Sequence, residues 1–234
     1  MKLIFRSFVV TMALVLVGVP LGASVSHAES NQKANTGLRE TTEFTIEEDG
    51  ETINVQTSEQ DGKLHTIFTD NKGTQEFTTD LNTNETDVES DYLTEEEINQ
   101  VETDYSNVEI DVEDEVIASE EAGFSINAIK GSWAWSGYRN VTVTANGKAS
   151  AQVITQAILS AIPKIGVAAG ALANVWLQYN LKTGYFKVRD GTALDTDPHY
   201  VWRKRTVKLY KEKSRKTLLS TKTSKAWRQY NHVI

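Results

Sequence analysis

The chain of 234 residues contains no cysteine, which excludes disulfide bonds and thiol chemistry. An exported chain without cysteine is consistent with a Gram-positive secretome. Histidine is also scarce in residues 130–234, which contain only His199 and His232. Catalysis by a histidine-centred site therefore has few candidate residues in that part of the chain.

Basic residues are almost missing from residues 29–129, which hold four of them against 28 acidic residues, a net charge of −24. Acidic residues are almost missing from residues 130–234, which hold four against 18 basic residues, a net charge of +14. A charge difference of this size indicates two units with different partners. We expect the acidic and basic regions to attract each other, and salt to weaken that attraction. The alternative is an acidic linker joined to a basic domain.

The N-terminus has the pattern of a secretory signal peptide. Lys2 and Arg6 form a basic front, residues 7–23 form an apolar run, and Ser26-His27-Ala28 is a small-x-small cleavage site. We therefore predict a secreted protein whose residues 1–28 are removed. A retained signal anchor is the alternative.

The acidic region shows a strand pattern followed by a helix pattern. Apolar and polar residues alternate over 41–81, and Asp49-Gly50 and Asp61-Gly62 stand at turn positions. This predicts a four-stranded antiparallel meander. Residues 93–105 predict a short helix with a capping box formed by Thr94 and Glu97. The acidic tract 108–123 is expected to be extended or disordered.

The basic region surrounds a long apolar stretch, residues 149–179, with the strand-like Val141 and Val143 before it and strand-like segments at 184–191 and 199–227 after it. Pro163 divides the stretch, because proline removes a backbone donor and clashes inside a helix. We expect helices over 149–162 and 166–179, each too short to span a bilayer. Gly166 and Gly170 form a GxxxG pattern that allows close helix contact. The stretch is either a buried hairpin, a buried hairpin able to insert into lipid, or a constitutive span.

The sequence contains few residue patterns that indicate an enzyme. Asp195, Asp197 and His199 lie close together in "DTDPH", but no second cluster supports a metal site there. No phosphate-binding glycine loop is present, and no partner can be assigned to a nucleophile such as Ser132. We predict that the protein is not an enzyme and has no cofactor.

The predicted fold class is α+β. An acidic region, 29–129, contains a small antiparallel meander with a short helix and a linker, and a basic domain, 130–234, contains antiparallel strands around an apolar helical hairpin. Tryptophan and tyrosine beside lysine and arginine suit a membrane interface, although the same rings suit a small core. The residues expected to contact a membrane are Trp133, Trp135, Lys164, Gly166, Gly170, Trp176, Trp202, Arg203, Lys204 and Arg205.

The order of segments resembles that of Gram-positive secreted bacteriocin or toxin precursors, with a signal, an acidic leader and a basic segment holding a Gly/Ala-rich apolar stretch. This resemblance implies a cationic membrane-active protein masked by its acidic region. Processing is expected between about 118 and 132, where the composition changes from acidic to basic and small, flexible residues would be open to a protease. The alternative is a secreted non-enzymatic surface or matrix protein that binds anionic wall polymers such as teichoic acids. Expected partners are an anionic membrane or cell-wall surface, the chain's own acidic region and a second copy of the chain. A nucleic-acid partner is not expected, because the export signal and the lack of a catalytic cluster disfavour a nuclease.

Overall fold

Two antiparallel sheets and three helices make up the described part of the chain, which is residues 41–117, 132–145 and 149–231 in this computed structural model. These residues belong to a single contact unit, Leu38–Ile234. The α+β prediction is therefore confirmed. The predicted signal peptide and most of the proposed processing region lie outside the described residues.

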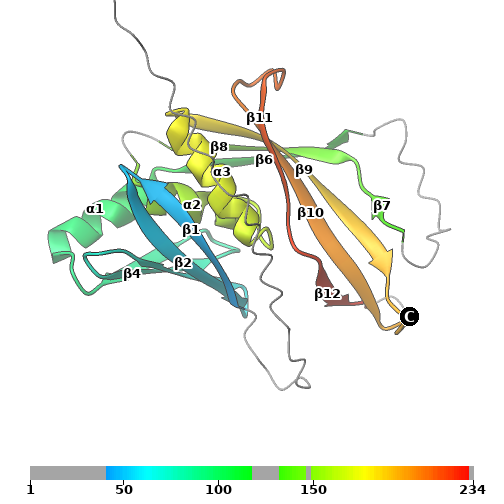
Figure 1. Ribbon diagram of the computed structural model, residues 1–234, viewed down its shortest axis with the longest axis horizontal. Coiled ribbons are helices and arrows are strands. Elements are labelled where there is room, and N and C mark those ends of the chain that lie inside the picture. The colour runs from blue at the N-terminus through cyan, green and yellow to red at the C-terminus, as the bar shows by residue number, and fades with distance from the viewer. Residues whose placement is uncertain (1–40, 118–131, 146–148, 232–234) are drawn as a thin grey trace, which may run out of the picture. The chain divides into compact units, whose positions relative to one another are not determined.

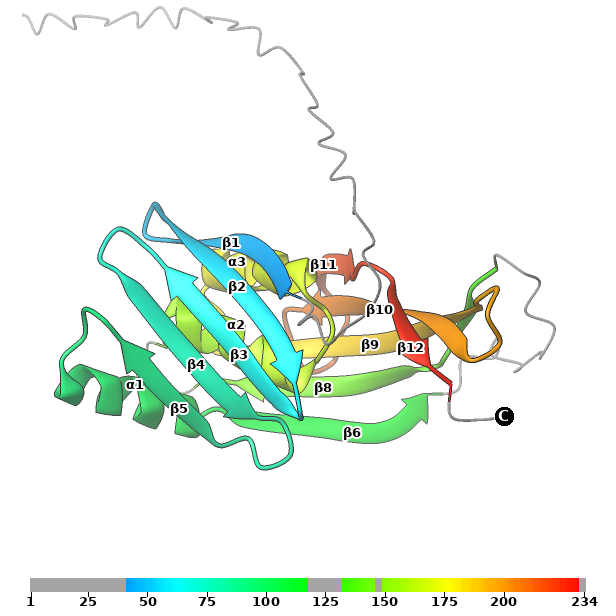
Figure 2. The same cartoon turned by 90° about the horizontal axis from the view of Figure 1, so that it is seen from below.

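The first sheet is a meander in which each strand pairs with the next along the chain (Figure 2). It contains β1 (Thr41–Glu48), β2 (Glu51–Gln60), β3 (Lys63–Thr69), β4 (Thr74–Asp80) and β5 (Thr86–Ser90). Asp49-Gly50 and Asp61-Gly62 all have positive φ, as the central residues of a type I′ hairpin turn require. The meander has five strands instead of the expected four, because β5 adds a strand whose only apolar residue is Val88.

Helix α1 (Glu95–Ser106) follows the first sheet and has the predicted capping box. The Thr94 hydroxyl accepts a hydrogen bond from the Glu97 backbone N–H, and the Glu97 carboxylate accepts one from the Thr94 N–H at 2.8 Å. These two bonds satisfy donors that a helix start would otherwise leave unpaired. The helix packs beside β5, where it buries the ring of Tyr105.

The second sheet runs in the order β11-β10-β9-β8-β6, with β12 paired to β10 and β7 paired to β9 (Figure 1). Its strands are β6 (Glu109–Ile117), β7 (Ala134–Trp135), β8 (Tyr138–Thr144), β9 (Thr183–Leu194), β10 (Tyr200–Tyr210), β11 (Leu218–Thr223) and β12 (Trp227–Tyr230). Strand β6 lies in the acidic tract, for which the sequence predicted either an extended or a disordered segment. The acidic region therefore supplies an edge strand to the sheet of the basic region, and the change of charge near residue 129 does not separate the sheets.

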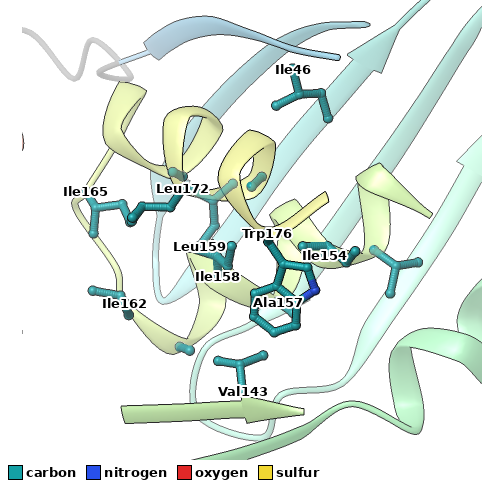
Figure 3. Close-up of a cluster of buried hydrophobic side chains, with 14 of the residues drawn as sticks. Ile46, Val143, Ile154, Ala157, Ile158, Leu159, Ile162, Ile165, Leu172 and Trp176 are labelled. Carbon is teal, nitrogen blue, oxygen red and sulfur yellow. The ribbon is translucent and has the colours of Figure 1, made fainter. Parts of the chain in front are cut away.

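Helices α2 (Ala151–Ala161) and α3 (Val167–Gln178) lie between the two sheets and are separated by the turn at Pro163 (Figures 1 and 2). Ten of the eleven residues of α2 are buried, which leaves this helix no solvent-facing side. A helix that is buried on all sides, polar residues such as Gln156 included, belongs to the core. Figure 3 shows Ile46 of the first sheet and Val143 of the second on opposite sides of Ile158 and Trp176. No helix in the described ranges is long and apolar enough to cross a membrane.

The GxxxG glycines contact a strand, which corrects the expected helix–helix contact. A Cβ placed on Gly170 would lie 2.4 Å from the ring of Phe44 and 3.0 Å from the carbonyl oxygen of Thr45. The missing side chain thus admits β1 against α3. Gly166 has a φ of +52° and a Cβ there would lie 3.1 Å from the Thr42 side chain. The spacing of four residues places both glycines beneath the same strand, a partner far away in the sequence.

Candidate functional site on the outer face of the second sheet

The two faces of the second sheet differ because side chains alternate along a strand. We call the face toward α2 and α3 the inner face and the opposite face the outer face. On β9 the buried inner residues Phe186 and Val188 are interleaved with Lys187 and Arg189, which point outward. On β10 the inner Val207 and Leu209 are likewise interleaved with Lys208, which points outward. Lys204 lies on the same outer face as Lys208. The sheet therefore carries an apolar side and a cationic side.

Cations and aromatic rings alternate across the outer face. Tyr138 lies between Lys208 and Arg189, whose charged groups are 4.8 Å and 4.9 Å from its ring centroid. Trp135 lies between Arg189 at 4.4 Å and Lys204 at 4.9 Å. Lys204 is also 4.0 Å from the ring centroid of Trp133. We call this set the cation–aromatic ladder: Lys208, Tyr138, Arg189, Trp135, Lys204 and Trp133.

Local backbone pairing holds the Trp135 ring in place. The two-residue strand β7 pairs Trp135 with Gly191. A Cβ on Gly191 would lie 3.0 Å from the indole ring, so the glycine allows the ring to rest on the sheet. After β7, the Ser136 N–H donates to the Asp190 carbonyl at 2.8 Å, and the Ser136 hydroxyl accepts from the Asp190 N–H at 3.0 Å. The ring is thus positioned before any ligand arrives.

The ladder is cationic without compensating carboxylates among the described residues. Arg189, Lys204 and Lys208 form no ion pair with any described acidic side chain. The outer carboxylates of β6 stand beyond β8, and Glu113 there accepts a hydrogen bond from Asn140 at 2.7 Å. The cations without a described carboxylate partner therefore lie on β9 and β10. A sheet face with these groups can hold an anionic ligand by charge while the rings supply apolar contact.

The inner face uses its charges differently. Arg205 donates to both carboxylate oxygens of Asp190 and to the carbonyl of Pro163, which ties β10 to the turn between α2 and α3. Arg139 pairs with the same carboxylate at 3.2 Å. Burial alone would raise the pKa of Asp190, but the hydrogen bonds and charges of the two arginines outweigh it and hold the pKa below its usual value. These residues form a structural network.

The ten residues expected at a membrane fall into separate environments. Trp133, Trp135 and Lys204 belong to the ladder, and the half-buried Trp202 shares the outer face. Arg203 and Arg205 project to the inner face, where Arg203 donates to Thr192 at 2.7 Å. Trp176 is 1% exposed and stacks on Phe186 in the core. Lys164 pairs with Glu59 at 3.1 Å, while Gly166 and Gly170 lie beneath β1. A membrane role for each of them stays a prediction.

Three ladder residues were not among the predicted site residues: Tyr138, Arg189 and Lys208. The signal that marks Arg189 and Lys208 is the alternation of basic and apolar residues in "FKVRD" and "TVKLY", which places every second residue on one face. That signal predicts that the basic residues share one face of the sheet. Which ring contacts which cation depends on the pairing between strands that are distant in the sequence.

The "DTDPH" loop forms an ion-pair cluster. Arg228 donates to the Asp195 carboxylate at 2.7 Å and lies 3.5 Å from that of Asp197. The hydrogen bond from Arg228 lowers the pKa of Asp195 to about 2. The ring of His199 stacks on Tyr230. No group of three or more potential metal ligands occurs within the described ranges.

Comparison with protein-family models, with curated proteins and with solved structures finds no match for this chain. The functional argument therefore depends on the geometry of the ladder and its surroundings.

Proposed function

We propose that this protein is a secreted, non-enzymatic binder of linear anionic polymers, and that the cation–aromatic ladder is its contact surface. Polyphosphodiesters of the cell wall, such as teichoic acids, have the required chemistry. The observation that carries the proposal is the ladder itself, in which three half-buried cations on the outer face have rings as neighbours and no described carboxylate as a partner.

The arrangement suits an extended chain of repeated negative charges. Lys204 and Lys208 are four residues apart on β10, which corresponds to about 13 Å along a strand. Arg189 lies on the neighbouring strand, about 4.8 Å away in the pairing direction. A polymer lying along β10 can therefore meet Lys204 and Lys208, with Arg189 beside it on β9. Rings that already contact the cations restrict their motion, so less side-chain entropy is lost on binding.

A binding experiment tests the proposal on residues 29–234, which include the whole described fold. We expect soluble poly(glycerol phosphate) to bind and neutral dextran not to bind in isothermal titration calorimetry. Lys204→Glu with Lys208→Glu should weaken polymer binding by at least about tenfold, since a basic residue near an anionic surface contributes about 1 kcal/mol. Lys222→Glu with Lys225→Glu is the matched control, because it makes the same charge change at exposed residues outside the ladder. Equal losses in both pairs would contradict a defined site on the outer face.

The membrane-active precursor is a second candidate, favoured by one observation. The apolar pair α2 and α3 is covered on one side by the first sheet, which belongs to the acidic region, through contacts such as Phe44 on Gly170. Cleavage between 118 and 132 would leave the first sheet held only by non-covalent contacts. Release of that sheet would expose an apolar helical surface beside a cationic sheet.

A leakage assay separates the two candidates. Under the precursor hypothesis, chain cut between 118 and 132 should release dye from anionic vesicles, and uncut chain should not. Ala169→Asp should abolish leakage while initial binding persists, because a carboxylate at a helix centre in lipid costs about 2.5–3.5 kcal/mol. Circular dichroism must show that the variant folds. Cut protein that binds vesicles without leakage leaves polymer binding as the better account.

A further inference from the structure

We propose that copies of this chain associate head to tail, with the outer face of the first sheet in one copy meeting the cation–aromatic ladder of the next. The two surfaces carry opposite charge. The partner in this contact is a second copy of this chain, which differs from the polymer partner proposed above. The proposal does not depend on polymer binding, although an anionic polymer would compete for the same ladder.

The outer face of the first sheet is acidic on β1, β4 and β5, whereas β2 contributes neutral residues and β3 contributes Lys63 and His65 to this face. Strand register places five residues in one row: Glu43, Gln56, Ile67, Glu76 and Glu89. The neighbouring row ends on β5 at Asp87. Among the described residues of these five strands, Lys63 is the only lysine or arginine. The face is thus negative where the ladder is positive.

The row also contains a place for an aromatic ring. A hollow of about 470 Å³ lies on this face beside Glu43, Gln56 and Ile67. Ile67 is a half-buried apolar residue, and Gln56 donates to the Glu43 carboxylate at 2.7 Å. Trp133, at one end of the ladder, is half-buried and next to the cation Lys204. The hollow and its carboxylate therefore match a ring and its neighbouring ammonium group in both polarity and charge.

The position of the two faces decides the type of assembly. The helices lie between the sheets, so the two outer faces point away from α2 and α3 on opposite sides (Figures 1 and 2). A contact between two different surfaces is heterologous, and it forms an open chain unless its rotation closes a ring. Assembly should therefore grow with concentration and not stop at a dimer. Because exposed charges are screened over about 8 Å at physiological salt, it should be strongest at low ionic strength.

A charge exchange tests this contact by sedimentation velocity on residues 29–234. The ladder variant is Lys204→Glu with Lys208→Glu, and the acidic-face variant is Glu43→Lys with Glu89→Lys. The wild type should associate at about 20 mM salt and dissociate at about 500 mM salt. Each variant alone should stay monomeric, because both of its faces then have the same sign. An equimolar mixture should associate again, since acidic faces of one variant meet basic faces of the other.

The outcomes are decisive in both directions. Recovery of association on mixing supports the contact, whereas a monomeric wild type at low salt or a mixture that stays monomeric overturns it. If the ladder variant fails to fold by circular dichroism, Lys204→Gln with Lys208→Gln replaces it. This second ladder variant should associate with itself at least about tenfold more weakly than the wild type does. Polymer binding is measured separately at a concentration where the wild type is monomeric. Failure of association then leaves the polymer result unaffected, and failure of polymer binding leaves the association result unaffected.

Discussion

The two sheets bury one face each against the same pair of helices, yet their outer faces are built in different ways. The outer face of the first sheet presents mainly threonine, glutamine and glutamate along plain hairpins, whereas that of the second stacks cations on aromatic rings. Both inner faces supply residues to one continuous core. The separation of charge along the sequence is therefore a separation of outer surfaces, and the core belongs to both regions.

The contacts between the regions show which force joins them. Lys164 with Glu59 is the ion pair that links the acidic and basic regions among the described residues. Other links are hydrogen bonds, such as the one from Tyr105 to Ser160 at 2.9 Å. Buried apolar side chains of both regions also form one continuous cluster. We infer that apolar burial, more than charge attraction, holds the first sheet on the helices, so the expected salt sensitivity of this docking should be small.

The largest expected effect comes from the core beneath the second sheet. Trp176→Ala should lower the free energy of unfolding by about 3–5 kcal/mol, because it removes a fully buried indole and leaves a cavity. Trp202→Ala is the control, since that ring is half-buried on the outer face. Urea denaturation of both variants measures the difference. Similar losses would mean that the outer face contributes to the core as much as the inner face does.

A second prediction concerns the docking of the first sheet. Gly170→Val should destabilise by about 1–3 kcal/mol, because its side chain collides with the Phe44 ring. Ala171→Val on the same helix tests the effect of a β-branched residue alone and should cost less. Adding Phe44→Ala to Gly170→Val should recover part of the loss in urea denaturation. If the two changes are simply additive, the strand–helix contact is not as close as described.

A third prediction, of similar size, concerns a polar bridge inside the core. The buried Gln156 side chain donates to the Thr79 hydroxyl at 2.8 Å, which links α2 to β4. Thr79→Val leaves the amide buried without this partner and should cost about 1–3 kcal/mol. Adding Gln156→Leu removes the amide and should recover most of that loss. A double-mutant cycle by thermal unfolding checks this, and additive losses would show that the two residues are not coupled.

Local signals in the sequence predicted the elements that depend on near neighbours. The two Asp-Gly turns, the capping box at Thr94 and the division of the apolar stretch at Pro163 all follow from residues a few positions apart, and the structure has each of them. The alternation of apolar residues over 41–81 likewise gave the buried face of the meander.

Pairings between distant residues were not predictable in the same way. Apolar residues alternate with carboxylates at the start of strand β6, but the sequence does not show that this strand pairs with β8 or in which register. The run Arg203-Lys204-Arg205 looked like one basic patch, but alternation sends Lys204 to one face and both arginines to the other. The partner of Gly170 is a strand more than 100 residues away. Each of these contacts is decided by tertiary packing.

The last and smallest effect should appear only in acid, at the network that ties β10 to the helical turn. The pKa of Asp190 is below its ordinary value of 3.8, despite burial that would raise it, because Arg205 and Arg139 bind the charged carboxylate. A carboxyl group with a lowered pKa stabilises the fold above its unfolded pKa, and that contribution is lost as the pH falls through the lower folded value. The stabilisation should therefore be complete above about pH 4 and decline below it. Asp190→Asn should be less stable than the wild type at neutral pH, and the difference should narrow below pH 4. Arg205→Gln removes the main partner of the carboxylate. In a protein that already carries Arg205→Gln, adding Asp190→Asn should therefore change the free energy of unfolding less, and with a weaker dependence on pH, than it does in the wild type. Urea unfolding between pH 7 and pH 2.5 measures these differences, and a constant gap between Asp190→Asn and the wild type over that range would mean that Asp190 is not held by the arginines.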